Sequence, residues 1–384
     1  MKIVAAPDKF KGSLTAIEAA TAIEAGVKRI YREAQVDLVP MADGGEGTVD
    51  TLLSATGGSV QFTVVAGPFG EPVEAAWGLI EDQEAGRTAV IEMSAASGLE
   101  LVAGVNDAPA TTTYGTGELI KTALDLGCRT IILGIGGSAT TDGGSGAAEA
   151  LGARFFDSRG RRLERGGGFL ADLAGIDTSK LDRRLAGTEV RVACDVDNPL
   201  YGTHGAASVY GPQKGATATE IARLDEGLRR FAAVVKNDLG LDIAETAGAG
   251  AAGGLGAGLM AFAGAELAPG AELISEAVGL RDRMAGALLV ITGEGRIDRQ
   301  TKRGKVPVGV ARLAKELGVP AVAIAGTIGP GAEEVYGSGL SAIEPICTRP
   351  MSFKEATEQA AMLVESAAER LLRVMRAGKL LSQE

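Results

Sequence analysis

The sequence TIILGIGGSATTDGGSG, residues 130–146, joins an apolar run to a glycine-rich loop. Its first residues, Thr130–Leu133, have the β-type apolar character of a buried strand, and residues 147–151 continue as the start of a helix. The loop between them holds six glycines. This pattern predicts a strand–loop–helix unit, and further units of the same kind along the chain predict an α/β fold.

The glycine loop has the composition of an anion cradle. Glycine has no Cβ atom, so consecutive backbone N–H groups can converge on a phosphate, and the following helix N-terminus adds a positive dipole end. Asp142 is the only carboxylate in the loop, and an oxygen ligand beside bound phosphates commonly holds Mg²⁺. The loop therefore predicts nucleotide binding, and a glycine-rich turn without a ligand is the alternative.

Composition limits the classes of protein that fit the chain. With 384 residues, of which 46% are hydrophobic and 23% charged, it has globular composition and enough length for two domains. The net charge of −11 argues against nucleic acid as a partner. The sequence contains neither a signal-peptide pattern nor an apolar run of about 18 residues, so we expect no membrane partner and a cytoplasmic location.

Several kinds of site are excluded by residue counts. His204 is the only histidine, which rules out multi-histidine metal sites and leaves a carboxylate as the expected general base. The three cysteines are too widely spaced for a disulfide framework or a zinc knuckle. The Walker and dinucleotide fingerprints are both absent, so phosphate must be bound by a different loop.

Two predicted strands near the start of the chain, residues 2–8 and Val36–Pro40, are each followed by a polar loop. A helix is expected between them, from about Ala16 to Glu33. Loops at the carboxyl ends of parallel strands line the ligand crevice of an open sheet. We therefore expect the DKFKGSL loop to lie beside the MADGGEGT loop, which brings together Asp8, Lys9, Lys11, Ser13, Asp43, Gly44, Gly45 and Glu46.

The alternation of elements predicts two domains. Three strand-like runs separated by turns, Ser59–Val65, Val73–Leu79 and Thr88–Glu92, have the pattern of antiparallel strands. The end of the chain returns to buried strands and closes with an amphipathic helix over Phe353–Arg376. We predict that residues 1–58 and 284–384 form a Rossmann/flavodoxin-like parallel-sheet domain and that residues 59–283 are an inserted second α/β domain, with the active site in the cleft between them.

Three later segments could carry chemistry. A strand over Arg191–Val196 ends in CDVDNPL, which makes Asp195 a candidate general base, although an aspartate of this kind can also cap its own turn. A strand over Ala287–Thr292 runs into the cationic GEGRIDRQTKRGK, which could hold an anionic substrate. GPQKGA adds a lysine in a glycine loop, and GAGAAGGLGAG is either a second anion loop or a closely packed helix.

Seven motifs, in order over essentially the whole chain, resemble the bacterial type I glycerate kinases: PDKFKGSLTA, ADGGEGT, GIGGSATTDGG, CDVDNPL, GPQKGA, GAAGGLG and TGEGRID followed by QT. The resemblance implies ATP-dependent, Mg²⁺-dependent phosphorylation of D-glycerate and a two-domain α/β architecture. It favours the 2-position of glycerate. Members of the family often have serine where this chain has Lys9, which leaves Lys11 and Ser13 as the safer site positions.

Phosphoryl transfer requires a phosphate cradle, a metal, a cation for the developing charge and a carboxylate that accepts the hydroxyl proton. We assign Asp195 to the base, with Asp298 as the alternative, and Lys11 to the developing charge. Metal binding is expected at Asp142. Phosphate or ATP binding is expected at Gly136, Gly137, Ser138, Thr140, Thr141, Gly293 and Gly295, and substrate binding at Arg296, which would grip the glycerate carboxylate, and at Ser13, Asp43, Gly44 and Gly45.

Other functions stay open from the sequence. The product could be 3-phosphoglycerate, the substrate could be another small hydroxy acid, or the chain could be a nucleotide or metabolite sensor without activity. The expected partners are ATP and D-glycerate, and a homo-oligomer is left open.

Overall fold

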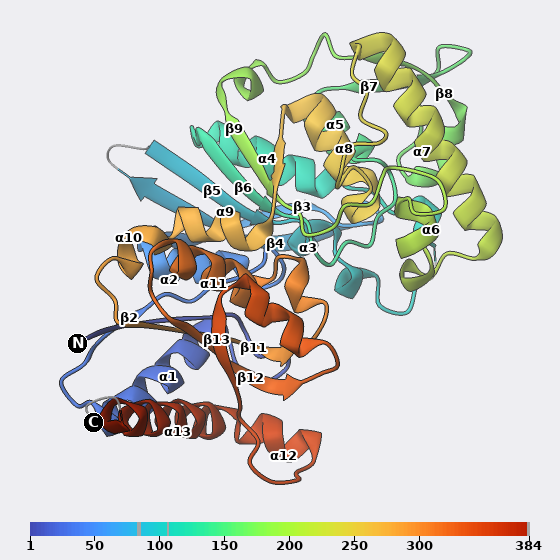
Figure 1. Ribbon diagram of the computed structural model, residues 1–384. Helices are drawn as coiled ribbons and strands as arrows, with labels where there is room; N and C mark the ends of the chain where they lie inside the picture. Colours follow the sequence, from blue (N-terminus) through green and yellow to red (C-terminus); the bar gives the residue numbers. More distant parts are fainter. Residues whose placement is uncertain (83–85, 106, 382–384) are drawn as a thin grey trace. The chain divides into compact units, whose positions relative to one another are not determined.

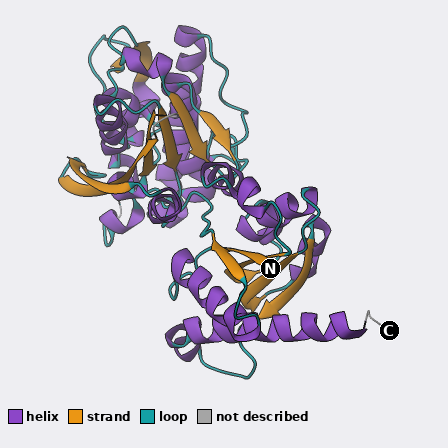
Figure 2. Cartoon of the chain, turned by 90° about the vertical axis from the view of Figure 1, so that its left-hand side faces the viewer, coloured by secondary structure: helices purple, strands orange, loops and turns teal. Residues whose placement is uncertain are grey.

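The computed structural model describes residues 1–82, 86–105 and 107–381. The chain divides into two compact units. The first consists of Met1–Asp43, Asp50–Thr56 and Pro269–Glu384, and the second of Gly44–Val49 and Gly57–Ala268. Both units contain parallel strands with helices on either side (Figures 1 and 2), so the predicted α/β class is confirmed.

The first unit is built on a five-stranded sheet in which every neighbouring pair is parallel. In the order β13-β12-β11-β1-β2, its strands are β13 (Leu340–Pro345), β12 (Ala321–Ile328), β11 (Leu289–Ile297), β1 (Lys2–Pro7) and β2 (Gln35–Leu38). Read from β2, this is the flavodoxin-like order, which reverses direction between β1 and β11. Ligands of such sheets bind outside the carboxyl ends of the strands at that reversal.

Two helices, α1 (Ala16–Ile30) and α13 (Ala360–Leu381), pack together on one face of this sheet (Figure 1). A Cβ atom on Gly26 of α1 would lie 2.3 Å from the carbonyl oxygen of Glu365, so glycine permits this close approach. The capping box of Thr15 and Glu18 starts α1 where the sequence predicts it. The other helices of the unit are α9 (Gly270–Ala277), α10 (Leu280–Met284), α11 (Val306–Glu316) and α12 (Phe353–Glu358).

The second unit contains a six-stranded mixed sheet of order β10-β9-β6-β5-β4-β3. Its parallel part comprises β5 (Gly86–Glu92), β6 (Thr130–Gly134), β9 (Glu189–Ala193) and β10 (Glu266–Ala268). The antiparallel strands β3 (Ser59–Ala66) and β4 (Pro72–Asp82) continue it from β5, as the sequence predicts. A separate antiparallel pair is formed by β7 (Arg154–Asp157) and β8 (Leu173–Asp177).

Helices of the second unit surround two apolar cores. One core joins the mixed sheet to α4 (Tyr114–Asp125) and α8 (Ala251–Ala263), and the other gathers Phe155, Phe231 and Phe262 around α7 (Ala218–Leu239). Shorter helices are α3 (Ser94–Ser97), α5 (Ser145–Ala150) and α6 (Ala206–Tyr210), and α2 (Thr48–Thr56) begins in this unit and ends in the first. No described helix combines the length and hydropathy needed to cross a bilayer.

Candidate functional site

The glycine loop leaves β6 at Gly134 and enters α5 at Ser145, so the predicted strand–loop–helix unit is present. Gly136 and Gly137 are exposed, and Gly137 has a φ of 73°, a conformation that glycine adopts without strain. Helix α5 has only six residues, so its dipole adds little to anion binding. The exposed backbone of the loop is therefore the part that could meet a phosphate.

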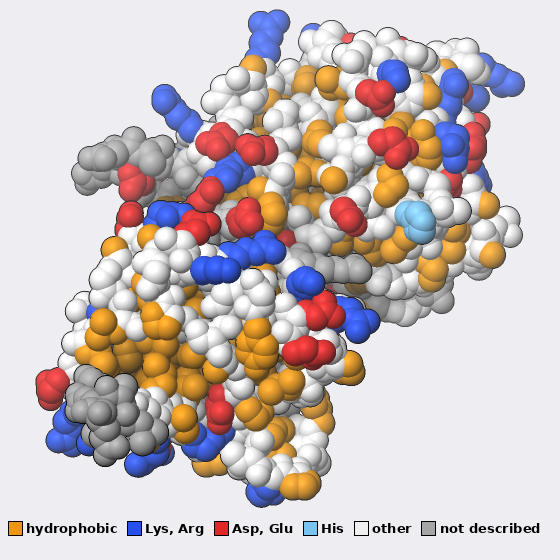
Figure 3. All heavy atoms as spheres, viewed as in Figure 1, with side chains coloured by type: hydrophobic (Ala, Val, Ile, Leu, Met, Phe, Trp, Pro, Cys, Tyr) orange, Lys and Arg blue, Asp and Glu red, His pale blue; other side chains and the backbone are white. Residues whose placement is uncertain are grey.

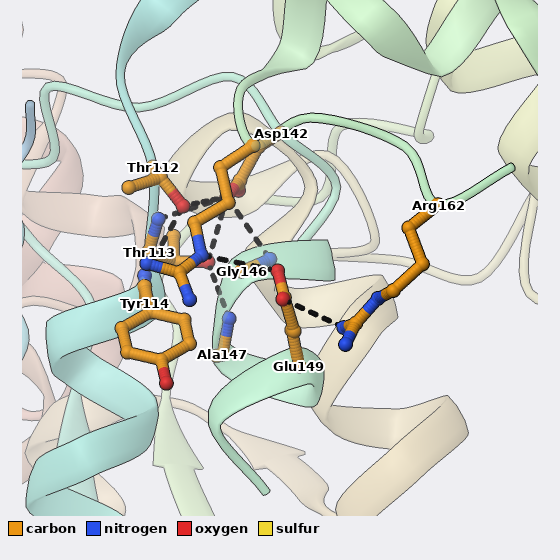
Figure 4. A network of polar contacts seen from close by, with 9 residues as sticks. Thr112, Thr113, Tyr114, Asp142, Gly146, Ala147, Glu149 and Arg162 are labelled. Carbon is orange, nitrogen blue, oxygen red and sulfur yellow. Dashed lines mark hydrogen bonds and ion pairs between the residues drawn. The ribbon is translucent and has the colours of Figure 1, made fainter. Parts of the chain in front are cut away.

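Asp142 belongs to this loop and has no exposed surface. Its carboxylate accepts hydrogen bonds from the N–H and the hydroxyl of Thr113 at 2.8 and 2.9 Å, from Thr112 Oγ1 at 3.3 Å and from the N–H of Gly146 at 3.2 Å (Figure 4). The N–H of Gly144 donates to its other oxygen at 3.0 Å. Burial raises the pKa of Asp142, and the bonds from Thr113, Gly144 and Gly146 oppose that rise.

These contacts bear on the metal expected at Asp142. Both carboxylate oxygens accept hydrogen bonds from the protein and the residue has no exposed surface, so a metal ion could reach them only if the surrounding loop opened. Within the described residues, no group of three or more His, Cys, Asp or Glu side chains has a metal-binding arrangement. The metal role of Asp142 stays a prediction, and its contacts argue for a structural role instead.

Lys214 contacts the glycine loop directly, and the sequence assignment did not include it. Its ammonium group donates hydrogen bonds to Ser138 Oγ at 2.8 Å and to the carbonyl of Thr140 at 2.6 Å. The residue is 5% exposed, and burial lowers the pKa of Lys214 to about 7, partly offset by the charge of Asp142. The signal that could have found it is the lysine of the GPQKGA motif.

Thr140 and Thr141 have their hydroxyls turned into the protein. Both residues are fully buried, and within the described part of the chain neither Oγ1 atom has a hydrogen-bond partner. In this conformation the two hydroxyls do not reach the surface of the loop. Thr140 and Thr141 could therefore contact a phosphate only through their backbone N–H groups or after a movement of the loop.

The GAAGGLG segment packs against the glycine loop. Gly253 accepts a hydrogen bond from the N–H of Gly143 at 3.0 Å, and a Cβ atom on Gly253 would lie 1.9 Å from the carbonyl oxygen of Thr140. Ala252, Gly253 and Gly254 all have positive φ values, which interrupt the start of α8. Of the two alternatives for this segment, close packing is the one that is observed.

Gly44 and Gly45 also pack against the loop. A Cβ atom on Gly44 would lie 2.1 Å from that of Ala193, and one on Gly134 would lie 2.2 Å from the carbonyl oxygen of Gly44. A Cβ atom on Gly136 would lie 3.2 Å from the Cα atom of Gly45. The structure thus brings part of the ADGGEGT motif to the glycine loop and to the end of β9.

Asp195 is exposed two residues beyond β9, which ends at Ala193 and not at Val196 as predicted. The turn after it is held by Asn198, whose amide donates to the carbonyl of His204 and whose oxygen accepts from the hydroxyl of Tyr210. His204 is itself exposed, and Figure 3 shows one pale blue side chain at the surface. Asp195 therefore meets the exposure requirement of a general base, while its role is untested.

In the first unit, Asp8 follows β1 at the reversal of strand order and is 7% exposed. Its N–H donates to the carbonyl of Gly293 at 2.8 Å, and its Oδ1 accepts from the N–H of Lys9 at 2.7 Å. Burial, reinforced by the charges of Asp43 and Glu294, raises the pKa of Asp8 to about 8. The sequence placed Asp8 in this crevice but gave it no role.

Glu294 is a second buried carboxylate of the first unit, and the site assignment missed it. Its oxygens accept from the hydroxyl of Thr301 at 2.6 Å and from the ammonium of Lys305 at 3.4 Å. Burial raises the pKa of Glu294, and Lys305 and Thr301 oppose that rise. Residues 293–295 were assigned through their glycines, so the acidic residue between them was overlooked.

A cavity of about 410 Å³ lies beside the DKFKGSL loop. It brings together three predicted site residues, Lys11, Ser13 and Gly295. The far wall comes from the segment after β13, including Ile346, Cys347, Arg349, Met351 and Phe353, which the sequence had not marked. The predicted residues Gly293, Arg296 and Asp43 are not part of its described lining.

Arg296 is 61% exposed and donates from Nε to Asp298 Oδ2 at 2.8 Å. The other oxygen of Asp298 accepts from the N–H of Gln300 at 2.8 Å. The terminal nitrogens of an arginine paired in this way can still bind a carboxylate. Asp298, in contrast, already has a cationic partner, which makes it the weaker candidate for a base.

Comparisons with known proteins agree over almost the whole chain. The sequence model of the glycerate kinase family matches residues 3–376. The chain is 52% identical to a glycerate kinase of Halalkalibacterium halodurans, over 96% of this chain and 97% of that protein. It is 50% identical to a glycerate 2-kinase of Escherichia coli, over 93% of each. A crystal structure from Salmonella typhimurium LT2, described as a candidate glycerate kinase 2, matches with a TM-score of 0.90 and 48% identity over 99% of both chains.

Proposed function

Since the chain belongs to the glycerate kinase family, we propose that it transfers the γ-phosphoryl group of ATP to D-glycerate and forms 2-phosphoglycerate. The observation that carries the proposal is the glycine loop after β6, with exposed glycines at its surface and a buried lysine behind it. The choice of the 2-position is supported by the relative from Escherichia coli, whose name specifies it.

The individual steps have candidate residues. The backbone of Gly136 and Gly137 would bind phosphate oxygens, and Asp195 would accept the proton of the attacking hydroxyl. Lys11, an exposed residue that lines the first unit's cavity, would stabilise the charge that develops on the transferred group. Arg296 would bind the glycerate carboxylate with the N–H groups that Asp298 leaves available.

We expect Mg²⁺ to be bound together with ATP. A divalent ion bound together with the nucleotide would neutralise phosphate charge during transfer. Among the described residues no group of three or more His, Cys, Asp or Glu side chains is arranged for a metal, and the oxygens of Asp142 already accept hydrogen bonds. No step of the proposed reaction is therefore assigned to a protein-bound metal. Dependence on ATP also supports a cytoplasmic location.

A coupled assay of ADP release tests the proposal. We expect ADP formation that requires D-glycerate and stops when EDTA removes Mg²⁺. Release of ADP only with another hydroxy acid would make that acid the substrate. Nucleotide binding without ADP release for any hydroxy acid would favour a sensor, and this outcome would contradict the proposed activity.

A further inference from the structure

Lys214 is an unusual residue because its charged group is buried beneath a loop. Removing an ammonium group from water is costly unless the protein supplies hydrogen bonds and charge. Here the ammonium donates to Ser138 Oγ and to the carbonyl of Thr140, both within the glycine loop. These partners lie 76 and 74 residues away in the sequence, so the contact exists only in the folded chain.

The bond to Ser138 fixes the direction of its hydroxyl. A lysine ammonium can only donate, so Ser138 Oγ must be the acceptor at 2.8 Å. A serine hydroxyl has one proton of its own, and that proton is then left for another acceptor. Ser138 adjoins the exposed residues Gly136 and Gly137, so an anion at the loop surface could receive it.

The bond to Thr140 fixes the other end of the same segment. The carbonyl of Thr140 is held by Lys214 at 2.6 Å, and Gly253 packs so closely against it that a Cβ atom there would lie 1.9 Å away. Ser138 and Thr140 are thus anchored by one side chain from the GPQKGA motif. The segment between the exposed glycines and α5 has little freedom to turn.

We propose that Lys214 is a positioning residue for phosphate binding: it orients the Ser138 hydroxyl toward the phosphate groups of a nucleotide and holds the loop in the binding conformation. The inference rests on the proposed function in one respect, that the anion at this loop is a nucleotide phosphate. When Lys214 is protonated, its positive charge lies one hydrogen bond from the Ser138 hydroxyl and adds electrostatic attraction without contacting the ligand.

A purely structural role is the competing explanation. In that case the long side chain of Lys214 would only fill space under the loop, and a residue of similar length would replace it without affecting phosphate recognition. Methionine has nearly the same length and no charge. The substitution Lys214→Met therefore separates the two roles, with Lys236→Met, an exposed lysine of the same unit, as a control of equal charge change.

The test is calorimetric binding of ADP and of adenosine to the full-length protein and its variants. For Lys214→Met we expect the dissociation constant of ADP to rise roughly tenfold or more, because a charge-assisted contact supports the phosphate site. Affinity for adenosine, which has no phosphate, should be unchanged, and Lys236→Met should bind both ligands as the wild type does. In turnover, KM for ATP should rise with no comparable change in KM for glycerate.

Ser138→Ala provides an independent test if Lys214→Met does not fold. It removes only the hydroxyl and should weaken ADP binding while leaving adenosine binding intact. The double variant should bind ADP little worse than Lys214→Met alone, because the lysine acts through the hydroxyl and the hydroxyl is no longer oriented without it. Wild-type ADP affinity in either single variant would overturn the inference. ADP binding that depends on Lys214 in a protein without glycerate turnover would instead refute the proposed function and leave the inference standing.

Discussion

The carboxylate of Asp142 accepts hydrogen bonds from both the N–H and the hydroxyl of Thr113, at 2.8 and 2.9 Å. Thr113 immediately precedes α4, and its hydroxyl also accepts from the N–H of Ala147 in α5. One buried carboxylate thus ties the glycine loop to the beginnings of two helices. This structural role accounts for the presence of an aspartate in the loop without requiring it to bind a metal.

Asp142→Asn should destabilise the protein strongly. An asparagine amide would direct N–H donors at the N–H groups of Thr113, Gly144 or Gly146, and each unpaired buried donor costs about 1–3 kcal/mol. We expect a loss on the order of 3 kcal/mol in the free energy of urea unfolding. Asp172→Asn, at an exposed position in the same unit, should have little effect. An unchanged stability combined with a higher Mg²⁺ requirement would restore the metal role.

Asp195→Asn should lower kcat by about 10² to 10⁴ while ATP affinity changes little, since general-base catalysis is typically worth that factor. Steady-state kinetics of Asp195→Asn and Asp298→Asn, measured side by side, check this. Asp298 is paired with Arg296, so its variant should mainly raise KM for glycerate. A loss of less than about tenfold in Asp195→Asn, together with an inactive Asp298→Asn, would move the base to Asp298.

Asp8 should make stability depend on pH in a defined direction. Its pKa is raised from 3.8 to about 8 in the folded chain, so between these values the folded state holds a proton that the unfolded state has lost. Stability contributed by this group therefore falls as pH rises toward 8. Asp8→Asn keeps an acceptor for the N–H of Lys9 and removes the ionisation.

The thermal midpoints of wild type and Asp8→Asn at pH 5 and pH 9, without ligands, report this effect. We expect the variant to gain relative to the wild type as pH rises. A difference between the two proteins that is the same at both pH values would show that Asp8 does not titrate in this window.

Cys347 offers a chemical probe of the first unit's cavity, which it lines. Ser13, a predicted contact of the substrate, also lines this cavity. We therefore expect glycerate, and not ADP, to protect Cys347 from alkylation by iodoacetamide, followed by peptide mass spectrometry. Cys128 is buried and should stay unmodified throughout, which reports that the fold is intact. Protection by ADP alone would identify the cavity as a nucleotide site.

Local sequence patterns predicted the strands and helix starts that depend on neighbouring residues in the chain. Apolar runs and the capping box at Thr15 gave the parallel strands and the start of α1 close to their observed positions. The helix predicted over Phe353–Arg376 is instead interrupted at Gln359, and β9 ends at Ala193. The first error is a break inside a predicted helix, and the second concerns the end of a strand, where assignments commonly differ by one or two residues.

The site was predicted less completely because its contacts join distant segments. Lys214 reaches Ser138 over 76 residues, and Asp142 reaches Thr113 over 29, separations that no motif specifies. The burial of Asp8 and Glu294 likewise depends on the pairing of β1 with β11. That the active site lies between two domains stays a prediction.

Phosphorus NMR of a reaction with ATP, Mg²⁺ and D-glycerate tests the proposed activity most directly, because it identifies the transferred group and the oxygen that receives it. The account predicts a growing phosphomonoester resonance that coincides with added 2-phosphoglycerate, together with the resonances of ADP. A resonance that coincides with 3-phosphoglycerate would contradict the assigned position. ATP resonances that stay unchanged, in the presence of protein shown to be folded, would contradict the kinase activity itself.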